Sequence, residues 1–514
     1  MDLPRSSGLL LHLTSLPSIH GIGDLGPSAY RFADSLAEAH QRIWQMLPVV
    51  PVGYGYSPYA SPSTFAGNPM LLSPDLLLEQ GLLLADDLAG KPDFPNHYVD
   101  FARVYPYKTK LLQRAFDRFE EKAASQERAA FAAFCKANDH WLPDYALFMA
   151  LKDAHRSVAW IEWPAPLAQR DPDALNAARN EYEYDIRKHT FWQFLFEQQW
   201  SALRAYCRQR SIRILGDLPI YVAHDSADVW ANPHLFYLDD TGNPTVVAGV
   251  PPDYFSETGQ RWGNPLYRWD MMQENHFSWW TQRLEKALTL FDIIRLDHFR
   301  AFAAYWEVPA EEKTAINGRW VDAPGTEFFV QIEARLGRLP LLAENLGVIT
   351  DDVTALMERF DFPGMAVLQF AFDTDADSEF LPHNYSKNLA AYPGTHDNDT
   401  LIGWWTNNQS TLDAEAVARA RAYALQYLNL DPDDVQQIHW RCIRLLMGSV
   451  AHLVVTPVQD VLGLGSHARM NTPGTVSDNW GWRLLPDQLT DEHLARLRTL
   501  TQLYGRSEDR EPPV

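Results

Sequence analysis

The chain has little cysteine and no long hydrophobic run. Cys135, Cys207 and Cys442 are its only cysteines in 514 residues, and their spacing matches neither a disulfide framework nor a zinc site. No stretch approaches the roughly 18 apolar residues that a membrane-spanning helix needs. The apolar run 8–13 is too short for a secretion signal. These absences argue against a disulfide-stapled secreted domain and a membrane protein, and they predict a cytoplasmic protein with reduced thiols.

Positive charge is also scarce. Lys and Arg number 44 against 66 Asp and Glu, so the formal net charge is −22. Such a surface repels phosphate backbones and anionic lipid head groups, so we expect neither a nucleic acid nor a membrane as partner. A neutral substrate fits better. Aromatic residues make up 12% of the chain, and they serve either a large core or a platform on which sugar rings stack.

Short apolar runs that end in polar or turn residues recur along the sequence, with helical patterns between most of them, as at 277–290 and 352–360. The runs are 9–12, 43–50, 212–217, 291–297, 339–344, 365–370, 389–395 and 453–458. Eight parallel strands close a barrel around their own side chains. The predicted fold class is therefore α/β, a (β/α)8 TIM barrel, with residues 1–514 forming a single catalytic unit.

The spacing of these runs predicts large insertions. Residues 51–211 separate the second and third strands, and apolar residues at helical spacing indicate a mostly helical subdomain there. After the third strand, residues 231–269 are rich in Pro, Gly and Trp and are expected to form a loop that covers the substrate. Residues 458–514 are too few for a C-terminal β-sandwich. The charged tail 506–514 is expected to be disordered.

Active sites of such barrels lie at the C-terminal ends of the strands. Asp297 ends the fourth apolar run, two residues after Arg295, so alternation points both side chains into the barrel mouth. A guanidinium favours the ionised form of a neighbouring carboxyl group, which a carboxylate nucleophile requires. A salt bridge that merely closes the barrel is the structural alternative.

Two further strand ends carry acids. Glu344 ends an apolar run, and desolvation raises the pKa of a carboxyl group as a general acid requires. Asp397 lies beside His396, where it could stabilise positive charge on a reacting sugar, although Asp397 or Asp399 could instead cap the next helix.

Together these acids predict glycoside cleavage. The third strand adds Asp217 at the rim, and two carboxyl groups with different pKa values across a sugar-sized mouth suffice for this chemistry. A retaining mechanism predicts about 5 Å between the carboxyl groups of Asp297 and Glu344. No metal-ligand spacing accompanies the acids, so we expect no metal and no cofactor.

The sequence resembles the α-amylase clan and, more closely, the amylomaltases, the 4-α-glucanotransferases of glycoside hydrolase family 77. The clan motifs are 295–298, 343–345 and 395–399; the more specific segments are 53–59, 65–69 and 250–265; and the resemblance runs from 10–17 to 479–483. It implies transfer of α-1,4-glucan segments to the 4-hydroxyl of glucose or of another α-1,4-glucan, by a retaining double displacement. Maltooligosaccharides, amylose, glycogen or starch would be substrates.

The resemblance also implies roles for single residues. Asp297 would be the nucleophile, Glu344 the acid/base and Asp397 the stabiliser of the transition state. Substrate would be bound by Tyr59, Ser57, Asp217, Arg295, His396, Asp253, Tyr254, Phe255, Gln260, Trp262 and Tyr54. Of these, Tyr59 would stack on the sugar at the cleaved bond, and Tyr54 would belong to a secondary glucan site.

Two positions depart from the pattern, and two other functions stay open. Asn345 stands where many family members carry an acid, and the third strand lacks the Asn-His pair with which amylases bind calcium, so no calcium is expected. An α-amylase-type hydrolase would use the same carboxylates, but the 250–265 segment and the missing β-sandwich disfavour it. A noncatalytic glycan-binding protein would not need the intact acid set.

Overall fold

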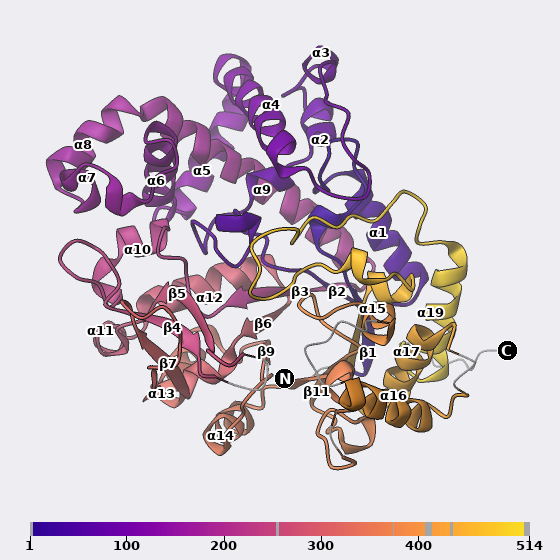
Figure 1. Cartoon of the computed structure of the whole chain (residues 1–514). Coiled ribbons are helices and arrows are strands. Elements are labelled where there is room, and N and C mark those ends of the chain that lie inside the picture. Colours follow the sequence, from indigo (N-terminus) through magenta and orange to yellow (C-terminus); the bar gives the residue numbers. More distant parts are fainter. Residues whose placement is uncertain (1–3, 253–255, 374, 407–413, 432–434, 508–514) are drawn as a thin grey trace.

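Eight parallel strands form the centre of the molecule (Figure 1). The computed structural model describes residues 4–252, 256–373, 375–406, 414–431 and 435–507. The barrel strands are β1 (Ser6–Leu10), β2 (Ile43–Gln45), β3 (Arg213–Pro219), β6 (Ile293–Asp297), β9 (Leu341–Ala343), β10 (Gly364–Val367), β11 (Leu389–Tyr392) and β12 (Leu453–Pro457). Each overlaps one predicted apolar run, and their spatial order follows the chain, so the predicted TIM barrel is confirmed.

The barrel closes between its last and first strands by a regular ladder and between β9 and β10 by single hydrogen bonds. β1 pairs with β12 over five residues, from Ser6 with Leu453 to Leu10 with Pro457. β9 and β10 stand at the two ends of the strand order. There the Ala343 N–H donates to the Pro363 carbonyl at 2.9 Å.

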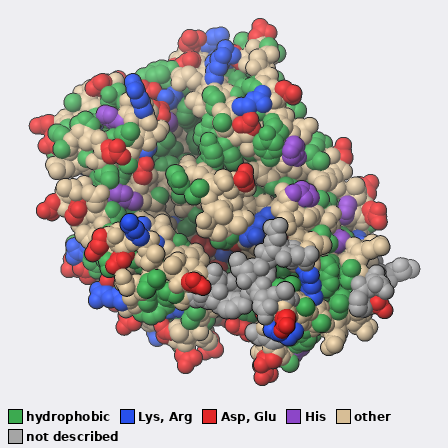
Figure 2. All heavy atoms as spheres, viewed as in Figure 1, with side chains coloured by type: hydrophobic (Ala, Val, Ile, Leu, Met, Phe, Trp, Pro, Cys, Tyr) green, Lys and Arg blue, Asp and Glu red, His purple; other side chains and the backbone are tan. Residues whose placement is uncertain are grey.

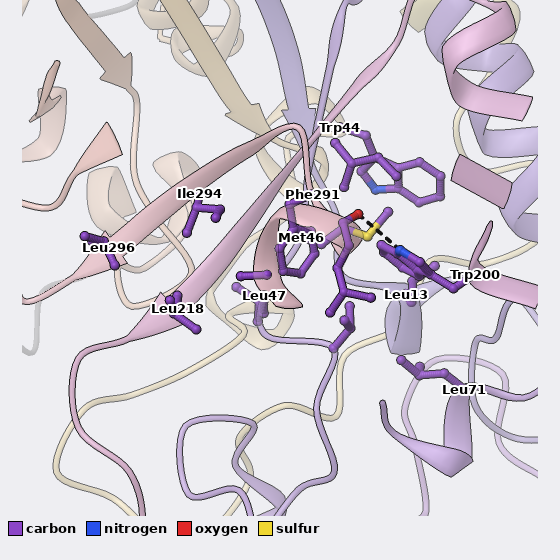
Figure 3. Packing of buried hydrophobic residues seen from close by; sticks show 14 of the residues in the cluster. Leu13, Trp44, Met46, Leu47, Leu71, Trp200, Leu218, Phe291, Ile294 and Leu296 are labelled. Carbon is purple, nitrogen blue, oxygen red and sulfur yellow. Dashed lines mark hydrogen bonds between the residues drawn. The ribbon is translucent and has the colours of Figure 1, made fainter. Parts of the chain in front are cut away.

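Apolar side chains cover both faces of the strands, which is why each strand reads as a nearly unbroken apolar run. Those inside the barrel are Leu10, Ile43, Leu215, Ile293, Leu342, Met365, Val367, Ala390, Tyr392, Leu453 and Val455. Their neighbours in sequence point outward. Figure 3 shows this outer layer, in which Trp44, Met46 and Phe291 pack near Trp200. The Trp200 indole also donates a hydrogen bond to the Leu290 carbonyl at 3.1 Å.

Helices cover the outside of the barrel. α12 (Ser278–Leu290) and α14 (Asp351–Phe360) begin within one residue of the predicted 277–290 and 352–360. The others outside the large insertion are α1 (Pro27–Glu38), α10 (Ala227–Ala231), α11 (Trp269–Glu274), α13 (Gly325–Leu336), α15 (Leu401–Thr406), α16 (Ala414–Leu428), α17 (Ile438–Gly448), α18 (Val458–Val461) and α19 (Asp491–Leu503). Within the described parts of the chain, none of the helices combines the length and apolar character needed to cross a bilayer.

The segment 51–211 folds into helices at one side of the barrel (Figure 1). They are α2 (Pro74–Glu79), α3 (Ala85–Leu88), α4 (Phe101–Lys122), α5 (Ser125–Ala137), α6 (Leu142–Ala154), α7 (Ala165–Ala168), α8 (Pro172–Glu181) and α9 (Glu183–Gln209). α4 buries an apolar stripe at helical spacing, from Leu111 to Phe119, of the kind that predicted a helical subdomain. α9 packs against α1, α4, α5 and α6 and so joins this subdomain to the barrel.

A four-stranded antiparallel sheet lies beside the barrel, and the sequence analysis did not foresee it. Its order is β5 (Gln260–Pro265), β4 (Val246–Val250), β7 (Ala304–Pro309) and β8 (Arg319–Asp322). Residues 231–269, predicted to be a loop, therefore supply two strands. The other two strands, β7 and β8, come from residues after β6, and β7 pairs with β4. Val247 of β4 packs on Val308 of β7 in a small hydrophobic core that is separate from that of the barrel. The backbone N–H and C=O groups of β4 find hydrogen-bond partners on β7, and the local sequence pattern does not reveal such a distant pairing.

The C-terminal segment packs against the barrel. Among described residues 458–507 there is no strand, in line with the expected lack of a β-sandwich. The prediction of disorder from residue 506 is wrong for Arg506 and Ser507, which are buried. The Arg506 guanidinium donates to backbone carbonyls of Ser6, Leu446, Met447, Ser449, Ala451 and His452. Residues 508–514 lie outside the described residues.

Candidate active site

The three predicted acids lie at C-terminal strand ends, in the same mouth of the barrel. Asp297 is the last residue of β6, and Glu344 directly follows β9. In the β6–β9 ladder Leu296 pairs with Ala343, so the next residues, Asp297 and Glu344, stand at the same level. Neighbouring strands lie about 4.8 Å apart. This register is compatible with the separation of about 5 Å predicted for a retaining pair.

Glu344 is buried and held by two backbone donors. Its side chain accepts hydrogen bonds from the His298 N–H at 2.8 Å and from the Leu346 N–H at 2.7 Å. Burial raises the pKa of the Glu344 carboxyl to about 7; Arg295 opposes this shift and the charge of Asp297 adds to it. Glu344 is therefore substantially protonated near neutral pH, as a proton donor must be.

A strained backbone turn aims one of these donors. His298 has φ of 53°, in the left-handed region that only a few per cent of non-glycine residues adopt. This turn directs the His298 N–H at the Glu344 carboxyl. The imidazole lies edge-on to Trp262 at 4.8 Å between ring centroids. Burial lowers the pKa of His298 to about 4, so the ring is neutral.

Arg295 links two carboxylates. Its Nη1 lies 2.8 Å from both carboxyl oxygens of Asp217 and 2.8 Å from Oδ1 of Asp297. Burial alone would lower the pKa of Arg295, but Asp217 and Asp297 raise it well above its usual value. The side chain of Asp217 is 0% exposed, whereas that of Asp297 is 29% exposed. The salt bridge offered as the structural alternative thus exists, yet it leaves Asp297 accessible from the mouth.

Tyr59, from the helical insertion, joins two strand ends. Its hydroxyl donates to Asp217 at 2.8 Å and lies 2.8 Å from Nε2 of His396. The Tyr59 and His396 rings stack with centroids 5.4 Å apart. Burial and the charge of Asp217 raise the pKa of Tyr59 well above its usual value, so its hydroxyl keeps its proton. The structure therefore brings Tyr59, Asp217, Arg295 and His396 together at one wall of the mouth.

Asp397 is held by residues that the sequence analysis missed. Its Oδ1 accepts a hydrogen bond from the Asn471 side chain at 2.6 Å, and its backbone carbonyl accepts one from Arg469 at 2.6 Å. The Asn471 N–H donates to the His396 carbonyl at 3.0 Å. Asn471 and Arg469 lie in an irregular segment after β12. No periodicity marks them, so no sequence signal could have placed them here.

The helix cap considered for this segment is supplied by other side chains. Asp399 accepts the Thr400 N–H at 2.8 Å, and Asp460 accepts the Leu401 N–H at 2.7 Å at the start of α15. Asp397 makes neither contact, and its side chain is 43% exposed. The capping side chain is that of Thr400, whose hydroxyl accepts the Gly403 N–H at 3.0 Å, so the capping interpretation applies to neither aspartate.

The remaining predicted residues are more dispersed. Trp262, on β5, is 39% exposed and donates to Gln260 at 3.1 Å. The Ser57 hydroxyl accepts the Tyr59 N–H at 3.2 Å, which is a local turn contact. Tyr54 is 79% exposed, and no described contact joins it to the acids. Residues 253–255, which include the predicted contacts Asp253, Tyr254 and Phe255, lie outside the described residues.

The surroundings of the acids suit a neutral, polar ligand. A small hollow borders Tyr59 and Asp217, and Asp297, Glu344 and Asp397 are not among the residues that line it. Over the described ranges no group of three or more His, Cys, Asp or Glu residues is placed to hold a metal ion; the metal-free site stays a prediction. Carboxylates are spread around the face in Figure 2 and do not gather in one patch.

Comparisons with known proteins agree on one family. The profile of the 4-alpha-glucanotransferase family, glycoside hydrolase family 77, matches residues 11–489. The 4-alpha-glucanotransferase of Thermus thermophilus is 52% identical over 511 residues, which cover 98% of this chain and 100% of the relative. That of Synechocystis is 50% identical over 505 residues and 98% of both chains.

Solved structures give the same result. The amylomaltase of Streptococcus agalactiae in complex with acarbose has a TM-score of 0.93 and 38% identity, covering 98% of this chain and 100% of its own. The amylomaltase of Corynebacterium glutamicum, at 18% identity and a TM-score of 0.81, shows the same fold over 97% of this chain and 75% of its own.

Proposed function

Because this chain belongs to the 4-alpha-glucanotransferase family, we propose that Asp297, Glu344 and Asp397 catalyse its reaction. That reaction transfers an α-1,4-glucan segment to the 4-hydroxyl of glucose or of another α-1,4-glucan, with retention of configuration. The observation that carries the assignment is the pair at the β6 and β9 ends. Glu344 is buried with its pKa raised to about 7, beside a more exposed Asp297 that Arg295 touches at one oxygen.

In the first step Glu344 donates its proton to the glycosidic oxygen while Asp297 attacks the anomeric carbon. The bond between that carbon and the oxygen breaks, and the reducing-end fragment leaves with a new hydroxyl group. A glucan chain then remains joined to Asp297 as an ester, and Glu344 is ionised.

In the second step the ionised Glu344 takes the proton from the 4-hydroxyl of an acceptor glucan. The acceptor oxygen attacks the anomeric carbon, the ester bond breaks, and Asp297 and Glu344 return to their starting states. Two inversions at one carbon give net retention.

The other polar groups bind and orient the sugar. Asp397, whose Oδ1 is fixed by Asn471, stabilises positive charge that develops at the anomeric carbon. Arg295 and Asp217 hold sugar hydroxyls at one wall of the mouth, together with His396. Tyr59 stacks on the sugar at the cleaved bond.

Transfer exceeds hydrolysis when an acceptor sugar occupies the site more effectively than water does. Trp262 reaches the mouth from β5 and contacts His298, whose N–H donates to the Glu344 carboxyl. The segment 254–262, of which residues 256–262 are described, is our candidate for excluding water. We further propose a cytoplasmic location, since Cys135, Cys207 and Cys442 are all free thiols.

Incubation with maltotriose tests the proposal. The wild-type enzyme should give glucose and longer maltooligosaccharides while the total of reducing ends stays constant; a steady rise in reducing ends without longer products would indicate a hydrolase. Asp297→Asn and Glu344→Gln should each lower transfer by at least about 10³-fold, since each removes a group that forms or breaks a bond. Wild-type transfer by Asp297→Asn would show that the role assignment is wrong.

A further inference from the structure

The seam between β9 and β10 lies beside Glu344 and is held by a side chain. Every other neighbouring pair of barrel strands forms a ladder in the described sheet, whereas β9 and β10 stand at its two ends. One backbone hydrogen bond crosses the seam, from the Ala343 N–H to the Pro363 carbonyl at 2.9 Å. The second crossing is a 2.7 Å hydrogen bond from the Met365 N–H to Oδ1 of Asn345.

These contacts complete a clamp around the main chain of Glu344. On the β6 side, the Glu344 N–H donates to the Leu296 carbonyl at 3.0 Å, and the Glu344 carbonyl accepts the Phe299 N–H at 3.1 Å. On the β10 side, the two hydrogen bonds across the seam hold Ala343, before Glu344, and Asn345, after it. Asn345 is therefore the only side chain among these four anchoring contacts.

Glycine at position 364 makes room for the Asn345 amide. A Cβ atom on Gly364 would lie 2.9 Å from Oδ1 and 3.0 Å from Nδ2 of Asn345. Such distances are shorter than van der Waals contact, so a larger residue would displace the amide. The amide thus packs on the bare backbone of β10 while it accepts the hydrogen bond of the next residue.

The main chain that these contacts hold also donates a hydrogen bond to the Glu344 carboxyl. Leu346, the residue after Asn345, donates its N–H to Oε1 of Glu344 at 2.7 Å. Residues 344–346 form a short connection with no ladder of their own. If the Asn345 anchor is lost, the main chain that carries this N–H is free to shift.

We propose that Asn345 is a positioning residue, whose amide oxygen fixes the Glu344–Leu346 main chain so that the Leu346 N–H stays on the Glu344 carboxyl. This inference rests on the proposed acid/base role of Glu344. This role requires a side chain at position 345 that accepts the Met365 N–H, and it does not require a charge there. An aspartate could accept the same hydrogen bond, so Asn345 and an acid are interchangeable as anchors.

Three variants test this inference, with kcat, KM and the pH profile of maltotriose transfer as readouts. Asn345→Leu, which keeps the size but removes the acceptor, should lower kcat about tenfold, the effect of one lost hydrogen bond, with KM nearly unchanged. The alkaline limb should move to higher pH, because the Leu346 N–H lowers the pKa of Glu344 and the charged groups acting on it, Arg295 and Asp297, are unaltered. Asn345→Asp should keep kcat within about threefold.

The controls separate the possible failures. Asn176→Leu, on exposed α8, should behave as wild type. If Asn345→Leu does not fold, Gly364→Ala decides, because it displaces the amide and should lower kcat in the same way. Wild-type kcat and pH limb in Asn345→Leu, or equal losses in Asn345→Leu and Asn345→Asp, would overturn the inference. An active Glu344→Gln enzyme would instead overturn the proposed function on which it rests.

Discussion

At the scale of single residues, Asp397 depends on a partner from a distant segment. Asn471 donates to its Oδ1 at 2.6 Å, which fixes the orientation of a carboxylate that is otherwise 43% exposed. A hydrogen bond to a charged group contributes about 1.5–3 kcal/mol. We expect Asn471→Ala to lower kcat by roughly 10- to 100-fold in maltotriose transfer. Asn176→Ala serves as the control, and an unchanged kcat in Asn471→Ala would show that Asp397 is positioned without Asn471.

Glu344 sets the pH dependence of the reaction. Its pKa is raised by burial to about 7, and the first step uses its protonated form. The rate of that step should therefore fall about tenfold per pH unit above pH 7. Single-turnover rates of glucan cleavage between pH 5 and 9 measure this limb. A decline that begins near pH 4.5, the ordinary value for Glu, would contradict the assignment.

The same raised pKa affects stability. Between pH 4.5 and 7 the folded state binds a proton at Glu344 that the unfolded state releases, so stability falls as pH rises through this range. Glu344→Gln lacks this dependence. The stability difference between Glu344→Gln and wild type should therefore shift in favour of the variant by on the order of 3 kcal/mol between pH 4.5 and 8. Denaturant titrations of both proteins measure it, and a pH-independent difference would refute it.

At the scale of elements, the antiparallel sheet brings Trp262 to the barrel mouth. Trp262 contacts His298 edge-on, and its removal should admit water beside Glu344. We expect Trp262→Ala to raise the ratio of reducing ends released to longer glucans formed several-fold. Trp320→Ala, on the β8 strand of the same sheet and 40% exposed, is the matched control. Equal ratios in wild type and Trp262→Ala would place water exclusion elsewhere.

The elements also show where sequence reasoning succeeds and where it stops. The barrel strands are buried on both faces, so each appears as an apolar run, and alternation then places Arg295 and Asp297 in the mouth. The sheet that carries Trp262 could not be predicted in this way, because β5 contains Gly263 and Pro265, and its partner β4 pairs on the other side with β7, far along the chain. Asn471 was missed for the same reason, since only the fold brings it to Asp397.

At the scale of the whole molecule, the net charge of −22 predicts how substrate arrives. A neutral glucan is neither attracted nor repelled by this charge, so long-range steering should not contribute to association. Raising NaCl from about 0.05 to 0.5 M should change kcat/KM by less than about twofold. A steep dependence on salt would instead indicate a charged substrate.

The most direct test of the account is to trap the glucan on the enzyme. In Glu344→Gln, α-maltosyl fluoride can still react, because fluoride leaves without a proton, but the ester should persist because no general base activates the acceptor. Mass spectrometry of digested protein should then find two hexose units on the peptide that contains Asp297. An adduct on a different carboxylate, or none under conditions where fluoride is released, would contradict the account.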